Sequence, residues 1–356
     1  APAPLARAGS VGAWLEMPPA MRTVARMLGV AAALGVSWFL GRAALRRARR
    51  ATRLRIDAIY VYPIKGCRGH SLASVELTPW GLKDDRRYMI VSAKGVFLSQ
   101  RELPKMALIH PELPTPEGIM LRAVEADGSN ASGQRPAPLW VPRVAEAQRA
   151  AAMLSLWEDS VPGVDQGDAA ANWLQAFLGK EGVRLFLVAD SARRATDPEY
   201  GVGETAFADG FPILLTSQAS VDEVNRRIKG GSNITLDNYR PNVHVTGCAP
   251  FEEDEIPGVT FKCAGGTARL ALIKPCSRCT VPNVNPRTGS REASGEPVRT
   301  LRNFRGTTLL QRTARLHKAF YQKPEMADSV FFGQNALASF TAGAFLSVGD
   351  EGVVER

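Results

Sequence analysis

Cysteine is scarce in this 356-residue chain: five are present, at positions 67, 248, 263, 276 and 279. An odd and sparse set of cysteines disfavours the disulfide framework of a small secreted protein and favours a reducing compartment. Histidine is scarcer still, and the four histidines, at 70, 110, 244 and 317, are scattered along the chain. The sequence therefore shows no cluster of nitrogen and sulfur ligands with the spacing of a structural zinc site.

Signatures of tightly bound electron carriers are missing as well. No G-x-G-x-x-G run follows a predicted strand, and no C-x-x-C-H haem-attachment motif occurs. Neither a dinucleotide-binding domain nor a c-type haem is therefore predicted. Any electrons used by this chain would have to come from another protein.

Positive charge is in excess only at the N-terminus. The formal net charge is +9, and residues 1–56 account for it with ten arginines and one acid, Glu16. Residues 57–356 carry 34 basic and 34 acidic side chains. A nucleic-acid-binding protein is expected to carry a basic face on its folded domain. We therefore expect no nucleic-acid partner.

One apolar run stands out near the N-terminus. Residues 27–41, MLGVAAALGVSWFLG, contain no charge; two arginines precede them closely, and seven follow between positions 42 and 55. Because arginine side chains can snorkel, the apolar span reaches roughly 18–20 residues, marginally enough to cross a bilayer. Arginines on the C-terminal side favour keeping that side in the cytosol.

From this pattern we predict a transmembrane signal-anchor at residues 24–45, followed by a basic linker at 46–54. Residues 1–23 precede the anchor and are expected to be an N-terminal extension; the sequence MRTVARMLGV beginning at Met21 is typical of a natural start, so residues 1–20 are the part expected to lie before it. The alternative is a transit peptide that is removed, since this arm is rich in arginine and poor in acid.

The remaining chain alternates short β-branched or aromatic runs with loops, which is typical of an α+β protein built on a barrel-like sheet. One helix is expected to begin at a cap on Asp168 and to end at Gly179, and another to span 218–228. An irregular excursion is expected at 112–150 and a polar loop at 191–210. Strands are expected at 55–62, 88–92, 96–100, 139–141, 184–189, 211–215, 243–246, 258–263 and 268–273.

The C-x-x-C motif at Cys276 and Cys279 allows several interpretations. A thioredoxin-like redox pair needs a helix after the motif, and Pro282 and Pro286 disfavour one. A structural zinc site needs two more nearby ligands. A single reactive thiolate, favoured by the charge of Arg278 beside it, is a third interpretation. Two unreactive cysteines in a loop at the end of a strand are equally compatible with this stretch alone.

Five segments in a fixed order carry a resemblance to a known family. The longest is KPCSRCTVPNVNPRTG at 274–289, and the others are YPIKGC at 62–67, DRRY at 85–88, YRPN at 239–242 and FGQN at 332–335. They resemble the MOSC superfamily, particularly the mitochondrial amidoxime-reducing components, over roughly residues 55–352. The resemblance implies a β-barrel-like MOSC fold, with an N-terminal β-rich MOSC subdomain at 55–187 and a MOSC domain at 188–354.

The same resemblance implies a molybdenum cofactor, Mo-molybdopterin. By this likeness Cys279 is the metal ligand and the catalytic residue, since a thiolate suits such a metal centre. Four cations suit the anionic cofactor, and further contacts come from small or polar residues. Relatives often carry Ser where Gly66 stands. The implied cofactor-binding residues are Lys65, Gly66, Arg86, Asp209, Gly210, Arg240, Asn242, Ser277, Arg278 and Asn335.

The activity implied by the resemblance is reduction of N-hydroxylated compounds, such as amidoximes and hydroxylamines, to amines. The family receives its electrons from NADH through cytochrome b5 reductase and cytochrome b5, and nitrite reduction to nitric oxide is a further family activity. The implied address is the mitochondrial outer membrane, with the C-terminal domain facing the cytosol; another organelle membrane is the alternative.

Two other functions stay open at this stage. One is a molybdenum-cofactor carrier or sulfur-transfer protein of the same superfamily, which would need a persulfide donor. The other is a membrane-tethered binding module in which the C-x-x-C motif is structural. Metal and pterin content separates the binding module from the first two functions, and turnover separates the reductase from the carrier.

Overall fold

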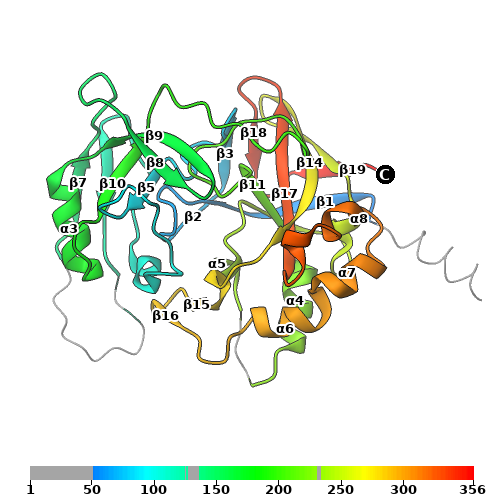
Figure 1. The fold of residues 1–356 in the computed structure, drawn as a ribbon. Helices are drawn as coiled ribbons and strands as arrows, with labels where there is room; N and C mark the ends of the chain where they lie inside the picture. The colour runs from blue at the N-terminus through cyan, green and yellow to red at the C-terminus, as the bar shows by residue number, and fades with distance from the viewer. Residues whose placement is uncertain (1–50, 125, 127–135, 231–233) are drawn as a thin grey trace, which may run out of the picture. The chain divides into compact units, whose positions relative to one another are not determined.

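A computed structural model describes residues 51–124, 126, 136–230 and 234–356, which belong to one compact unit, Ala51–Arg356 (Figure 1). The anchor predicted at 24–45 lies outside these residues, as do the extension before it and most of the basic linker. Within the described ranges, no helix is long and apolar enough to cross a membrane.

The centre of this unit is a closed barrel of seven strands. Around the barrel the order is β1, β12, β11, β17, β14, β13 and β19. The ring is closed because β19 pairs with β1. All neighbouring pairs are antiparallel except β11 and β12, which are parallel. These strands are β1 (Arg53–Val61), β11 (Ile213–Ser217), β12 (Val243–Thr246), β13 (Gly258–Cys263), β14 (Gly266–Ser277), β17 (Phe331–Phe340) and β19 (Glu351–Val354). The predicted barrel-like α+β fold is confirmed.

Alternating side chains explain why these segments close into a barrel. Along β1 the side chains of Leu54, Ile56, Ile59 and Val61 are at most 1% exposed, and they belong to the same apolar cluster as Phe261 of β13. Branched apolar residues fit the pleated inner face of a sheet. β1 falls within the N-terminal subdomain predicted from the sequence, yet it pairs with two strands that follow residue 240.

A second, four-stranded sheet is formed by β5 (Tyr88–Val91), β10 (Arg184–Val188), β9 (Asp159–Asp165) and β8 (Ala152–Leu156), in this order. Helix α3 (Asp168–Leu178) packs on it and buries the predicted apolar face of Trp173, Leu174, Phe177 and Leu178. Gly179 ends the helix in the left-handed conformation, as predicted.

The predicted cap on Asp168 is wrong. Gly167 occupies the N-cap position with φ 94°, and Asp168 is the first helical residue. Its carboxylate accepts a hydrogen bond from Arg184 Nη2 at 2.8 Å, so it contributes negative charge to the first turn instead.

The strand predicted at 96–100 is also wrong, because this segment forms only isolated bridges before the chain turns. The turn is fixed by Glu102, whose carboxylate accepts hydrogen bonds from both the backbone N–H and the hydroxyl of Ser99. The predicted excursion at 112–150 contains a two-stranded sheet of β6 (Gly118–Leu121) and β7 (Leu139–Pro142) in its described part.

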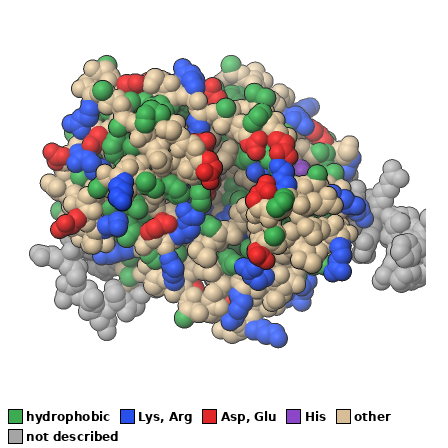
Figure 2. All heavy atoms as spheres, in the orientation of Figure 1, with side chains coloured by type: hydrophobic (Ala, Val, Ile, Leu, Met, Phe, Trp, Pro, Cys, Tyr) green, Lys and Arg blue, Asp and Glu red, His purple; other side chains and the backbone are tan. Residues whose placement is uncertain are grey.

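The other elements are short and lie around these two sheets. The strands are β2 (His70–Leu72), β3 (Ser74–Thr78), β4 (Gly81–Leu82), β15 (Val284–Asn285), β16 (Ser290–Arg291) and β18 (Phe345–Ser347). The helices are α4 (Gln218–Arg227), α5 (Leu236–Tyr239), α6 (Val298–Arg305), α7 (Thr307–Thr313) and α8 (Lys318–Tyr321), with 3-10 turns η1 (Pro104–Leu108), η2 (Glu252–Glu255), η3 (Val281–Asn283) and η4 (Pro324–Met326). On the face seen in Figure 2, basic and acidic side chains are interspersed.

Candidate active site

A cavity of about 140 Å³, here called the inner cavity, brings together distant parts of the chain. Its lining comes from the loop after β1, the turn before β5, the loop before β11, the end of α5, the end of β14 and strand β17. All eleven residues selected from the sequence line it: Lys65, Gly66, Arg86, Asp209, Gly210, Arg240, Asn242, Ser277, Arg278, Cys279 and Asn335. Their roles stay predictions, but their proximity is a feature of the structure.

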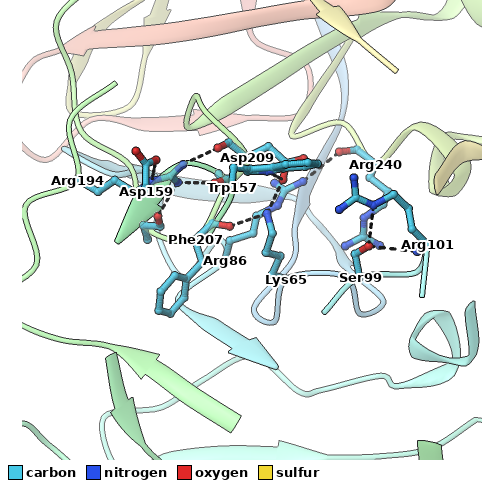
Figure 3. A network of polar contacts seen from close by, with 12 residues as sticks. Lys65, Arg86, Ser99, Arg101, Trp157, Asp159, Arg194, Phe207, Asp209 and Arg240 are labelled. Carbon is cyan, nitrogen blue, oxygen red and sulfur yellow. Dashed lines mark hydrogen bonds and ion pairs between the residues drawn. The ribbon is translucent and has the colours of Figure 1, made fainter. Parts of the chain in front are cut away.

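A buried lysine and an exposed carboxylate form one edge of the site. The Lys65 side chain is 8% exposed, and its Nζ lies 2.5 Å from Asp209 Oδ1 and donates to the carbonyl of Phe207 at 2.9 Å. Burial lowers the pKa of Lys65, and the charge of Asp209 opposes this. Desolvation by the neighbouring residues raises the pKa of the Asp209 carboxyl. The charge of Lys65 and the hydrogen bonds from Lys65 and Trp157 outweigh this effect and hold the pKa below its usual value. Figure 3 shows these groups together.

Arg86 is fixed by three partners. Its Nη1 donates to Asp85 Oδ2 at 2.6 Å and to Asn242 Oδ1 at 2.9 Å, and its Nη2 donates to the carbonyl of Arg240 at 3.3 Å. Asn242 Oδ1 also accepts a hydrogen bond from the backbone N–H of Leu214, and Asn242 Nδ2 donates to the carbonyl of Tyr60. Asn242 therefore lines the inner cavity chiefly as a support for Arg86.

Two guanidinium groups of the inner cavity bear N–H donors that have no acceptor among the described residues. Arg240 and Arg86 lie on the Tyr62 ring, 4.2 and 4.4 Å from its centroid, yet Arg240 Nη2 is buried without a partner. Arg278 donates through Nη2 to the carbonyl of Tyr239 at 2.8 Å, while its Nε is buried without a partner. A buried donor left unpaired costs about 1–3 kcal/mol. An anion in the inner cavity would remove that cost.

The two cysteines of the C-x-x-C motif differ in their surroundings. Cys279 is exposed, and its sulfur accepts a hydrogen bond from the backbone N–H of Val281, at 3.5 Å. Cys276 is half-buried, and its sulfur lies 3.2 Å from Arg278 Nη1. The arginine expected to favour a thiolate in this motif therefore contacts Cys276 directly, and Cys279 is the more exposed thiol of the two.

The surroundings of the motif bear on the zinc and thioredoxin interpretations. The motif begins in the last two residues of β14 and ends just before the 3-10 turn η3, so the α-helix of a thioredoxin-like site is not found there. In the part of the chain that the structure describes, no group of three or more His, Cys, Asp or Glu side chains is placed to hold a metal ion. A site with one cysteine ligand and a cofactor-borne metal needs no such group.

Gly66 lies in the left-handed backbone region, and its carbonyl is hydrogen-bonded. Its φ is +81°, and a Cβ there would lie 2.8 Å from Met106 Cε. Its carbonyl accepts a hydrogen bond from Gln100 Nε2 at 2.7 Å. The serine that relatives often carry at this position would therefore be strained in this chain.

Some lining residues carried no sequence signal: Ser99 and Gln100 also line the inner cavity. Tyr239 lines it too; it belongs to the YRPN segment but was not selected as a site residue. A larger outer cavity of about 700 Å³ shares part of that lining and adds residues from the β8–β9 turn and the loop before β11. The shared residues are Asp209, Gly210, Phe211, Cys276, Ser277, Arg278, Cys279 and Asn335.

The donor set fits an anionic cofactor that carries a soft metal. Cys279 offers an exposed thiol, and Arg240 and Arg278 offer buried N–H groups with no acceptor in the described protein. The fold and the site together define a class of protein: a closed β-barrel whose cavity joins a free thiol to several cations.

Comparison with models of known families identifies the family of this chain. The MOSC N-terminal beta barrel domain matches residues 53–181, and the MOSC domain matches residues 202–353. The chain belongs to the MOSC family and carries both of its domains in this order.

Curated relatives extend over most of the chain. Mitochondrial amidoxime-reducing component 1 of Mus musculus is 28% identical over 293 residues, which cover 78% of this chain and 81% of that protein. Mitochondrial amidoxime reducing component 2 of Homo sapiens is 28% identical and covers 79% and 83%. Molybdenum cofactor sulfurase of Drosophila grimshawi is 30% identical over 68% of this chain but only 30% of that longer protein.

Proposed function

We propose that this chain is a molybdenum-dependent reductase that converts amidoximes, hydroxylamines and related N-hydroxylated compounds into amines. The observation that carries the proposal is the convergence of an exposed thiol and four cations on one cavity, from segments far apart in the chain. The names of the relatives that are 28% identical support the same reaction.

The residues around the inner cavity have distinct parts in this proposal. When bound, the molybdenum cofactor supplies the two-electron reduction that removes the N-hydroxyl oxygen as water. Cys279 holds the metal through its thiolate. Arg240 and Arg278 direct their unused N–H groups at anionic oxygens of the cofactor, and Lys65 adds positive charge at the edge of the site. Asn242 keeps Arg86 in place.

We also propose that electrons arrive from NADH through cytochrome b5 reductase and cytochrome b5, because the sequence contains no carrier signature of its own. The relatives' names support a mitochondrial address. The apolar run at 27–41 supports attachment to a membrane, which we propose to be the outer membrane, with the described domain in the cytosol. Resistance of the chain to alkaline extraction from membranes, lost when residues 1–50 are deleted, tests that attachment.

The first test of the activity compares the two cysteines. Purified protein should contain close to one molybdenum atom per chain by plasma mass spectrometry. The metal should be lost in Cys279→Ala and retained in the matched control Cys276→Ala, because Cys279 is the exposed thiol whereas the Cys276 sulfur accepts a hydrogen bond from Arg278. Full molybdenum in Cys279→Ala would disprove the ligand assignment.

Turnover then separates the reductase from a cofactor carrier or sulfur-transfer protein. With cytochrome b5, its reductase and NADH, the loaded chain should reduce benzamidoxime, and nitrite can be assayed in the same system. A fully loaded protein that reduces neither compound would favour the carrier, the alternative supported by the likeness to molybdenum cofactor sulfurase.

A further inference from the structure

Trp157 occupies an unusual backbone position at the tip of the β8–β9 turn. Leu156 and Asp159 pair across the turn, so Trp157 and Glu158 alone connect the two strands. The φ of Trp157 is +55°, a left-handed value that favours Gly, Asn or Asp, and that is rare for a large aromatic residue. A strained residue that persists at the wall of a cavity is a candidate for a functional role.

The contacts of Trp157 hold its ring at the wall of the outer cavity. Its Nε1 donates to Asp209 Oδ1 at 3.0 Å, its ring lies 5.0 Å from that of Phe97, and the Arg101 guanidinium lies 4.3 Å from its centroid. In Figure 3 the indole lies beside the Asp209 carboxylate. The residue is nevertheless 46% exposed, so part of the indole surface is free.

The outer cavity connects this indole to the proposed metal ligand. Trp157 and Cys279 both line it, and at about 700 Å³ it falls within the range of small-molecule sites. Asp209 belongs to the linings of both cavities, and its Oδ1 accepts hydrogen bonds from both Lys65 Nζ and Trp157 Nε1. The indole is therefore fixed next to the site without being buried.

We infer that the outer cavity is the substrate site and that Trp157 is its stacking surface, which selects planar aromatic N-hydroxylated compounds over small aliphatic ones. The inference rests on the proposed reductase function and names its substrate class. A fixed aromatic ring gains free energy from offset stacking with an aryl amidoxime and gains little from a methyl group.

Binding is tested first, by a measurement that needs no turnover. The chain has six tryptophans, and the indole N–H signal of Trp157 is assigned as the one lost in Trp157→Phe. In the full chain carrying its cofactor, benzamidoxime should shift this signal and leave that of Trp140 unchanged. Trp140 is 41% exposed and lines neither cavity, so it is a matched control. Equal shifts at both residues, or none at Trp157, would overturn the inference.

Kinetics then test selection between substrates. In the assay with cytochrome b5, its reductase and NADH, Trp157→Leu should raise KM for benzamidoxime about fivefold, equivalent to about 1 kcal/mol of stacking. KM for acetamidoxime should change less than twofold, and Trp140→Leu should behave as wild type. Trp157→Phe keeps a ring but loses the hydrogen bond to Asp209, and it should retain most of the affinity for benzamidoxime.

Failure of the inference and failure of the proposed function give different results. Equal losses for both substrates in Trp157→Leu, or equal losses in Trp157→Phe and Trp157→Leu, would mean that the residue only supports Asp209. If the loaded wild type reduces neither amidoxime, the proposed function itself fails. If the wild type reduces both amidoximes and Trp157→Leu raises KM for both by the same factor, only the stacking surface is disproved.

Discussion

Two partly buried arginines of the inner cavity, Arg240 and Arg278, carry buried N–H groups that find no acceptor among the described residues. Burial lowers the pKa of Arg240, and its Nη2 has no acceptor among the described residues. Stacking on Tyr62 compensates for part of this cost, since a cation over an aromatic ring is stabilised by about 0.5–2 kcal/mol. We expect such a residue to be retained for its ligand rather than for the stability of the fold.

Replacing Arg240 by Met should therefore separate ligand binding from stability. The free energy of unfolding of cofactor-free Arg240→Met should be unchanged or raised by about 1 kcal/mol, because a buried unpaired donor is removed. Its molybdenum and pterin content should fall at least tenfold. Chemical denaturation and metal analysis of the same preparations measure both effects.

A matched control exists outside the cavity. Arg227 of α4 also stacks on an aromatic ring, 4.1 Å from the centroid of Phe304, but it is not part of the cavity lining. Arg227→Met should keep full cofactor content. Full molybdenum and pterin content in Arg240→Met as well would show that the unpaired N–H donor at Arg240 Nη2 does not contact the cofactor.

Among the elements, those whose patterns are local were predictable from the sequence. The alternating pattern of β1 and the apolar face of α3 gave the correct element types, because each buries one face against a sheet. The helices α6, α7 and α8 were not predicted: they span eight, seven and four residues, too short for a clear period. The site residues came from motif likeness, and Trp157 carried no motif because its role depends on a turn conformation.

A buried histidine on β12 gives the barrel a measurable pH dependence. His244 is 0% exposed; its Nδ1 pairs with Thr216 Oγ1 at 2.8 Å and its Nε2 with Gln218 Oε1 at 3.0 Å. Burial lowers the pKa of His244 to about 4. The unfolded chain takes up this proton near pH 6.5. The neutral His244 side chain therefore contributes fully to the stability of the folded barrel above pH 6.5, and this contribution is lost as the pH falls toward 4.

His244→Gln tests this contribution. Between pH 7 and pH 4.5 the free energy of unfolding of the wild type should fall by about 1–3 kcal/mol more than that of the variant, measured by urea denaturation. Between pH 7 and pH 9 the two curves should run parallel, because the histidine is neutral in both folded and unfolded chains. If the unfolding free energies of wild type and variant also run parallel between pH 7 and pH 4.5, then His244 takes up its proton in the folded barrel as readily as in the unfolded chain.

At the scale of the whole molecule, the barrel depends on a strand from the far end of the sequence. β1 pairs with β12 through Arg55–Ile59 and with β19 through Arg53–Arg55, and these two contacts close the ring. The other six strands all follow residue 212. Without β1, the strands β12 and β19 would each expose an unpaired edge, and the apolar interior would open along their length.

A fragment of residues 188–356, which starts at the boundary predicted from the sequence, should therefore not fold alone. It should be aggregated or lack cooperative thermal unfolding, whereas residues 51–356 should unfold in one transition. Co-expression with residues 51–187 should restore a soluble complex, because β1 can then pair across the cut. The N-terminal piece also supplies Lys65 and Arg86 to the inner cavity, so cofactor should be retained only by the complex. Cooperative unfolding of 188–356 alone would mean that β19 and β12 can close the barrel without β1.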